Sequence, residues 1–174
     1  MSNLSSDGSP LFPSIDEGSF EALRAHLQRL AESLPAHFCL LSNLSGLLLL
    51  TAGEVDPRQA TSFASLLAAN ISAVKQIALL IGEDAGFEKN FFEGKTHNLY
   101  VHELENDYIL TIVFSRQTTF GLVRSLSQRY APIFTELLEQ SGSDKPSVIP
   151  NRSPGDSFST ELTSRLDSLF KLEE

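Results

Sequence analysis

The segment 57–81 constrains the fold most, because it is long, apolar and clearly bounded at both ends. Asp56 followed by Pro57 is typical of a helix start, with Asp as the N-cap and Pro at the first helical position. Gly82 is typical of a helix end. Between residues 59 and 81 the only charged side chain is Lys75. A solvated helix face usually carries Lys and Glu, so this helix is predicted to be covered on more than one side.

Two faces of this helix differ in kind. A stripe of large apolar residues should face the domain core: Phe63, Leu67, Ile71, Val74, Ala78 and Ile81. A second set follows a 3-4-3-4 spacing and is small and uncharged up to its last member; we call it the small-residue face: Ser62, Ser65, Ala69, Ser72 and Gln76. Small residues let another backbone approach closely. That backbone could belong to a partner or to another element of the same domain, and the pattern leaves both open.

The remaining elements alternate between helix and strand. Residues 14–34 predict an amphipathic helix with one apolar face, closed by Pro35: Phe20, Leu23, Leu27, Leu30 and Leu34. Residues 38–41 and 47–51 predict a β-hairpin around an Asn/Ser/Gly turn. Strands are expected at about 88–92, 98–104 and 108–114, and a helix at 119–140. Pro132 lies inside this last helix and predicts a kink near Gln128.

Both ends of the chain differ in composition from the middle. Residues 1–13 are rich in Ser, Pro and Gly and are predicted to be disordered, and residues 141–156 predict a flexible linker. Residues 157–172 predict a short amphipathic helix with an apolar face: Phe158, Leu162, Leu166, Leu169 and Phe170. Such a helix is marginal alone in water, so it should dock on its own domain or on another chain.

The composition excludes several classes of protein. There are 13 Lys and Arg against 22 Asp and Glu, a net charge of −9, which argues against a nucleic-acid binder. The single Cys39 excludes an internal disulfide framework. The N-terminus does not resemble a signal peptide, and the longest uncharged stretch, residues 33–53, is interrupted by polar residues. We therefore expect a cytoplasmic protein that does not insert into a membrane.

Few residues suggest catalysis. The nucleophile-elbow, phosphate-loop and dinucleotide-binding motifs are absent from the sequence. His97 and His102 are five apart in a predicted strand, so they should lie on opposite faces of the sheet as surface residues and not share a metal ion. Cys39 is expected to be an inert core residue. The sequence thus predicts no catalytic residue, metal or cofactor, although a triad assembled from distant positions stays open.

The order helix, two strands, long helix, three strands, helix, together with local motifs over residues 14–140, resembles the Roadblock (dynein light chain-like) family. The matching motifs are Ser65-Leu66-Leu67-Ala68-Ala69-Asn70, Ile81-Gly82-Glu83, Glu93-Gly94, Leu99-Tyr100-Val101, Val113-Phe114 and Phe120-Gly121-Leu122-Val123-Arg124. The resemblance implies an α/β sandwich with a five-stranded antiparallel sheet, followed here by a tethered C-terminal amphipathic helix. A bacterial group in the family carries a C-terminal segment similar to residues 166–170.

The resemblance to that group also implies a function. Its members are homodimers that activate GTP hydrolysis by a small Ras-like GTPase in cell polarity and motility, which suggests a cell pole as a location. They rearrange the switch regions of the GTPase and insert no arginine finger, although Arg58 and Arg124 remain candidates for one. The dimer would form along the strand after the long helix, through Lys89, Asn90, Phe91 and Phe92. The partner-binding residues would be Ser65, Ala69, Ser72, Gln76, Leu162, Leu166, Leu169 and Phe170.

Two other functions remain as alternatives. A Roadblock scaffold could bind a partner without changing GTP turnover. A hydrolase with a dispersed triad is the more remote alternative.

Overall fold

The computed structural model describes residues 15–83, 86–105 and 107–141. In chain order its elements are α1 (Glu17–Ser33), β1 (Ala36–Asn43), β2 (Leu48–Gly53), α2 (Pro57–Leu80), β3 (Lys89–Glu93), β4 (His97–Glu103), β5 (Tyr108–Ser115) and α3 (Phe120–Ser141). This is the α-β-β-α-β-β-β-α order expected from the sequence. The predictions for residues 1–13, the linker from 142 onward and the helix at 157–172 lie outside the described residues.

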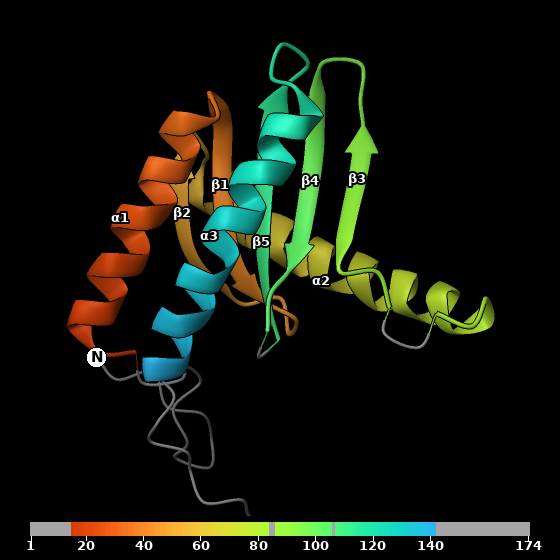
Figure 1. Ribbon diagram of the computed structural model, residues 1–174, viewed down its shortest axis with the longest axis horizontal. Coiled ribbons are helices and arrows are strands. Elements are labelled where there is room, and N and C mark those ends of the chain that lie inside the picture. Colours follow the sequence, from red (N-terminus) through yellow and green to blue (C-terminus); the bar gives the residue numbers. More distant parts are fainter. Residues whose placement is uncertain (1–14, 84–85, 106, 142–174) are drawn as a thin grey trace, which may run out of the picture. The chain divides into compact units, whose positions relative to one another are not determined.

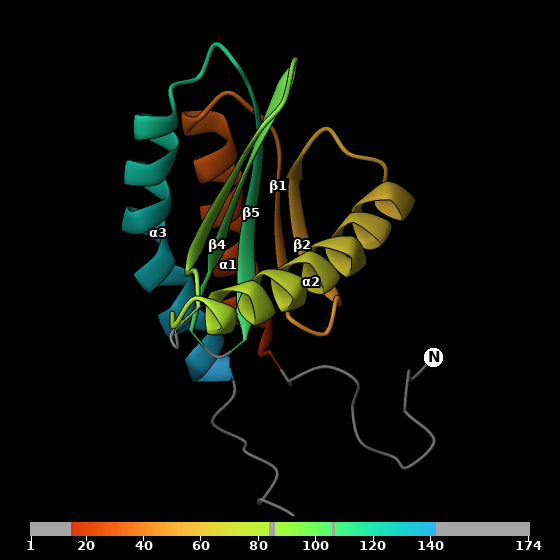
Figure 2. The same cartoon turned by 90° about the vertical axis from the view of Figure 1, so that its right-hand side faces the viewer.

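One antiparallel sheet organises the domain, with strand order β2-β1-β5-β4-β3. Helices α1 and α3 lie side by side on one face, and α2 crosses the other face (Figure 1). Figure 2 shows the sheet edge-on, with α1 and α3 on one side and α2 on the other. The outer strands β2 and β3 form the two edges of the sheet.

Local signals place the starts of two helices and the first hairpin. The carboxylate of Asp56 accepts the amide hydrogens of Arg58 at 3.0 Å and Gln59 at 3.2 Å, which caps α2. Asp16 caps α1 in the same way by accepting the Ser19 amide at 3.0 Å. In the β1–β2 turn, the Asn43 side chain accepts the Leu47 amide at 2.9 Å, and Gly46 takes a φ of +83°.

The larger core lies between the sheet and the α1–α3 layer. It is built from alternate residues of the strands and from the apolar stripe of α1, with Leu23, Leu27 and Leu30 fully buried. The sequence places Phe20 on this stripe, but in the structure it is 37% exposed, in the first turn of α1. Cys39 is buried in this core, as predicted, and burial raises the pKa of its thiol to about 12.

The smaller core lies under α2, where Leu67 and Ile71 meet Val101 and Ile109. The rest of the buried side of α2 is alanine, at positions 60, 64, 68 and 78, which brings the helix close to the sheet. The prediction that Ile81 belongs to this stripe is wrong. Ile81 is the C-cap residue and is 68% exposed, because the helix ends beyond the region in which it contacts the sheet.

Pro132 does not divide the last helix. The chain forms one continuous α-helix, α3, from Phe120 to Ser141. One side of the helix stays in the larger core over most of its length, through Val123, Phe134 and Leu138. These contacts hold the two halves in register across the missing backbone hydrogen bond of the proline.

Candidate functional site: the outer face of helix α2 and the β3 edge

The small-residue face of α2 is exposed in the described chain. All five members, Ser62, Ser65, Ala69, Ser72 and Gln76, are exposed on the side of α2 away from the sheet. The β1–β2 turn packs against one of them, since a β-carbon on Gly46 would lie 2.9 Å from the Ser65 α-carbon, so internal packing accounts for the small side chain at that end of the face. The other four members are exposed within the described part of the chain. At one end of the face the Ser65 hydroxyl lies 3.4 Å from the Gly46 carbonyl oxygen. Ser72 turns its hydroxyl onto the Ala68 carbonyl at 2.9 Å.

The only charge between residues 59 and 81 does not interrupt this face. Lys75 turns toward the sheet, where its ammonium group forms an ion pair with the carboxylate of Glu103 at the end of β4. The outer side of α2 therefore stays uncharged from residue 59 to residue 81. An uncharged, exposed helix side of this length is typical of a surface that contacts another protein.

Large apolar side chains accumulate toward the C-terminal end of α2. Leu80 is 87% exposed and Ile81 68%, and Ile77 and Leu79 are more than half exposed. Figure 1 shows why: the helix passes behind the sheet and continues past β3, the edge strand. The end of α2 therefore extends past the sheet edge, with Ala78 buried on its inner side and these four apolar side chains left exposed.

By length and composition α2 would also qualify as a membrane-spanning helix, and it is the one such helix in the described ranges. The core helix of a globular domain passes the same test, and α2 does pack its alanine side on the sheet. Only 28% of its most apolar 18-residue window is buried within the chain, however. The apolar composition of α2 is thus only partly explained by the internal core.

The β3 edge adjoins this surface. Phe91 and Phe92 are both 39% exposed and point to opposite faces of the sheet. The Phe91 ring lies 4.6 Å from that of Phe120 on the α3 side. Phe92 lines a groove of about 410 Å³ on the α2 side, together with Phe63, Leu66, Leu67, Asn70 and Leu99. The other predicted interface residues, Lys89 and Asn90, begin the same strand.

A second groove lies at the N-terminal end of α2. It has a volume of about 520 Å³ and is mostly apolar, lined by Phe38, Val55, Arg58, Gln59, Ser62, Phe63 and Leu66. The rings of Phe38 and Phe63 meet edge to face at 5.6 Å within it. Arg58 is therefore a cation beside the small-residue face, whereas Arg124 lies on α3, on the opposite face of the sheet.

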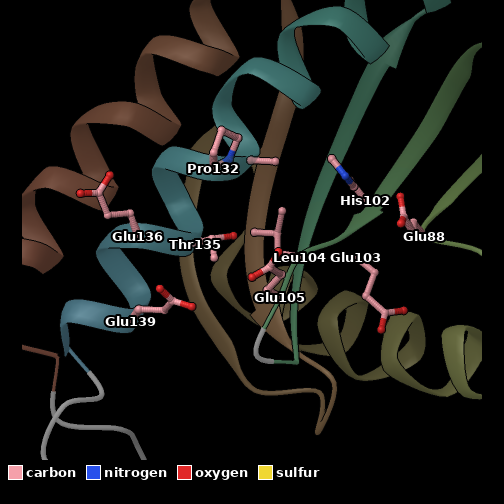
Figure 3. A pocket seen from close by; sticks show the side chains of 10 residues that line it. Glu88, His102, Glu103, Leu104, Glu105, Pro132, Thr135, Glu136 and Glu139 are labelled. Carbon is pink, nitrogen blue, oxygen red and sulfur yellow. The ribbon is translucent and has the colours of Figure 1, made fainter. Parts of the chain in front are cut away.

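An acidic groove of about 440 Å³ lies between α3 and the β4–β5 end of the sheet (Figure 3). Five glutamates line it: Glu88, Glu103, Glu105, Glu136 and Glu139. Glu88 pairs with Lys89 at 2.8 Å, which lowers the pKa of its carboxyl group, and Glu103 pairs with Lys75. In the described ranges no three His, Cys, Asp or Glu side chains are grouped so that they could hold a metal ion.

His102 borders the acidic groove, and its placement corrects the expectation of a surface histidine. It is only 7% exposed, and its Nδ1 lies 2.8 Å from the Ser127 hydroxyl of α3. The prediction that His97 and His102 lie on opposite faces of the sheet is confirmed by the alternation along β4. Tyr100 and His102 face α3, whereas Leu99 and Val101, which share the face of His97, lie toward α2. His97 is exposed, as expected. The predicted terminal partner residues Leu162, Leu166, Leu169 and Phe170 lie outside the described residues.

Comparison with known proteins decides the family. The Roadblock/LC7 domain profile matches residues 22–114, which is more than half of the chain. The chain belongs to the Roadblock/LC7 family. No curated protein sequence matches it significantly.

Solved Roadblock structures of bacterial origin share its fold. Myxococcus xanthus MglB is 31% identical, with a TM-score of 0.67, and the match covers 72% of this chain and 94% of that one. The gliding protein MglB from Thermus thermophilus is 24% identical, with a TM-score of 0.68, and the match covers 75% and 99% of the two chains. An MglB structure with a tetrameric arrangement is also 24% identical, with a TM-score of 0.69 and the same coverage. This Roadblock chain is thus MglB-like in fold and, at 31% identity to the first of these, in sequence.

Proposed function

We propose that this protein is an MglB-like, homodimeric activator of a small Ras-like GTPase. The observation that carries the proposal is the outer side of α2, which is uncharged, exposed and lined by small residues from Ser62 to Ser72. The 31% identity to Myxococcus xanthus MglB supports the assignment to this branch of the family. The partner implied by the resemblance is an MglA-like GTPase, in the cytoplasm and at a cell pole during polarity or motility.

The proposed dimer joins two copies along β3. The edge strand has unpaired backbone groups on its outer side, which a second copy can pair in an antiparallel ladder. In this arrangement the overhanging end of α2 from one copy would extend over the sheet of the other. Its exposed Ile77, Leu80 and Ile81 would then enter the partner copy's groove beside Phe92 and Leu99. Two small-residue faces would lie next to each other and form one continuous docking surface.

Activation is proposed to work by rearranging the switch regions of the GTPase, which then supplies its own catalytic groups. The small-residue face supports this mechanism because it carries no arginine between Ser62 and Gln76. An inserted arginine finger raises the turnover number of a GTPase by a factor of roughly 10³–10⁵. Replacing Arg58 by Ala should therefore leave the stimulated rate within a few-fold of wild type, and a loss of that larger size would assign Arg58 as a finger.

The decisive experiment is single-turnover GTP hydrolysis by the cognate GTPase with increasing amounts of this protein. We expect stimulation that saturates near two chains per GTPase. Ser72→Arg should abolish both stimulation and binding, because a long charged side chain would replace a small one in the centre of the contact. The matched control is Ser125→Arg, which places the same charge at an exposed position of α3, on the opposite layer.

Each outcome has a distinct meaning. Full binding by Ser72→Arg, with an unchanged circular dichroism spectrum, would remove the small-residue face as the docking site. A stable complex without stimulation would favour the scaffold function instead. Stimulation by Ser125→Arg equal to wild type is needed to show that the effect of Ser72→Arg is local.

A further inference from the structure

Two histidines that are far apart in sequence meet at one end of the sheet. His37 lies on β1 and His97 begins β4, and their ring centres are 4.3 Å apart with the rings inclined at 63°. Both side chains are exposed. Neither the family fold nor the proposed GTPase contact requires this pair.

The backbone holds both residues in fixed positions. Strand β5 lies between the two strands, with His97 opposite Ser115 on one side and Phe38 opposite Val113 on the other. The His37 carbonyl also accepts the Glu54 amide at 2.9 Å. The two side chains therefore stand together in the folded protein at no further cost in backbone entropy.

The hydrogen bonding of His97 leaves one ring nitrogen for a ligand. Its Nδ1 lies 3.1 Å from the Thr96 hydroxyl, an arrangement that orients the ring and leaves Nε2 for coordination. The cation in the adjacent loop, Arg116, turns toward the Glu93 carboxylate at 3.6 Å. The Glu93 carboxylate therefore partly neutralises the positive charge of Arg116, which reduces its repulsion of a metal ion at the two imidazoles.

The spacing of the two rings is close to the one that shared coordination of a metal ion needs. Two imidazoles bound to one tetrahedral ion at about 2.0–2.1 Å have ring centres about 5 Å apart. At the observed 4.3 Å the two rings are in edge contact, and small rotations of these exposed side chains would open them to that separation. Imidazole is a ligand that Zn²⁺, Cu²⁺ and Ni²⁺ accept well.

We propose that His37 and His97 form a two-histidine binding site for a divalent transition metal ion, with water completing the coordination. No third His, Cys, Asp or Glu joins the pair within the described part of the chain, so the site is expected to be open and of moderate affinity. It includes no residue of the small-residue face and does not depend on the proposed GTPase contact.

The test uses the full chain without an affinity tag, freed of metal by a chelator and titrated with Cu²⁺, Ni²⁺ and Zn²⁺ alone by calorimetry. We expect one preferred site per chain, with Cu²⁺ bound most tightly. His37→Ala and His97→Ala should each weaken this site at least about tenfold, because the second imidazole binds at a high effective concentration. Bound Cu²⁺ should also give an electron spin resonance signal with nitrogen coupling that either variant alters.

The matched control is His26→Ala, which removes a histidine of α1 that packs beside Tyr130. Its metal affinity should equal that of wild type. Equal affinities for wild type, His37→Ala and His97→Ala would overturn the proposal, as would a loss confined to only one of the two. Unchanged circular dichroism of the metal-free variants keeps misfolding from imitating the expected result.

Discussion

At the scale of single residues, His102 shows how a polar group is accommodated in this core. Its ring is buried between β4 and α3, where its Nδ1 lies 2.8 Å from the Ser127 hydroxyl and its centre lies 6.3 Å from that of the Tyr100 ring. The charged groups that act on it are those of Glu88 and Lys89. Burial is the main cause that lowers the pKa of His102 from 6.5 to about 4, and the positive charge of Lys89 adds to it. Glu88 acts in the opposite direction.

This burial predicts an acid-sensitive fold. Between pH 6.5 and about 4 the unfolded chain binds a proton on this histidine and the folded chain does not, so stability should fall as the pH falls through that window. Urea unfolding at several pH values between about 7.5 and 4.5 measures the effect. His102→Asn should have a flatter pH dependence than wild type. Parallel curves for the two proteins would show that other groups dominate the acid sensitivity.

At the scale of elements, the junction of β2 with β1 depends on one glycine. Gly53 has a φ of +95°, and a β-carbon there would lie 2.4 Å from the His37 carbonyl oxygen and 2.8 Å from the Phe38 α-carbon. Both the backbone conformation and the close approach of β1 therefore exclude a side chain. This contact lies at the last residue of the edge strand β2.

Gly53→Ala should accordingly destabilise the domain by about 2–4 kcal/mol in the free energy of unfolding. Gly121→Ala is the matched control, since nothing lies within 4 Å of a β-carbon there and the residue is in the first turn of α3. That change should be neutral or stabilise by about 0.5–1 kcal/mol. Denaturant midpoints compare the two, and equal effects would mean that the close contact at Gly53 relaxes without cost.

At the scale of the whole molecule, the surface on the α2 side is suited to association through two adjoining parts. The β3 edge offers backbone groups and Phe92, and the end of α2 offers exposed apolar side chains. Phe92→Asp should convert the proposed dimer into a monomer, because a carboxylate would then have to be buried in the groove beside Leu99. Sedimentation velocity measures this change.

Leu122→Asp is the control for that experiment. Leu122 is 44% exposed on α3, so the substitution introduces the same charge into an exposed apolar position on the other layer. This variant should form the dimer over the same range of protein concentration as wild type. A dimer formed equally well by Phe92→Asp would place the self-association elsewhere on the molecule.

The sequence by itself determined the order and approximate bounds of the elements. Capping by Asp56, the Asn/Ser/Gly turn and the alternation along β4 are local signals, so they could be interpreted without knowledge of the fold. The motifs of the family were equally visible. The sequence also indicated that the small-residue face is unusual, but not whether a partner or another element of the same domain would pack against it.

The tertiary structure alone decided where each side chain is exposed and which distant residues meet. Ile81 fits the helical period of the core stripe, yet it is exposed because α2 runs past the edge of the sheet. Lys75 is on an apolar helix but pairs with Glu103 on β4, and His102 contacts Ser127, 25 residues away. His37 and His97 are brought together only because β5 lies between their strands. Each depends on long-range pairing of elements, for which the spacing of residues along the chain carries no signal.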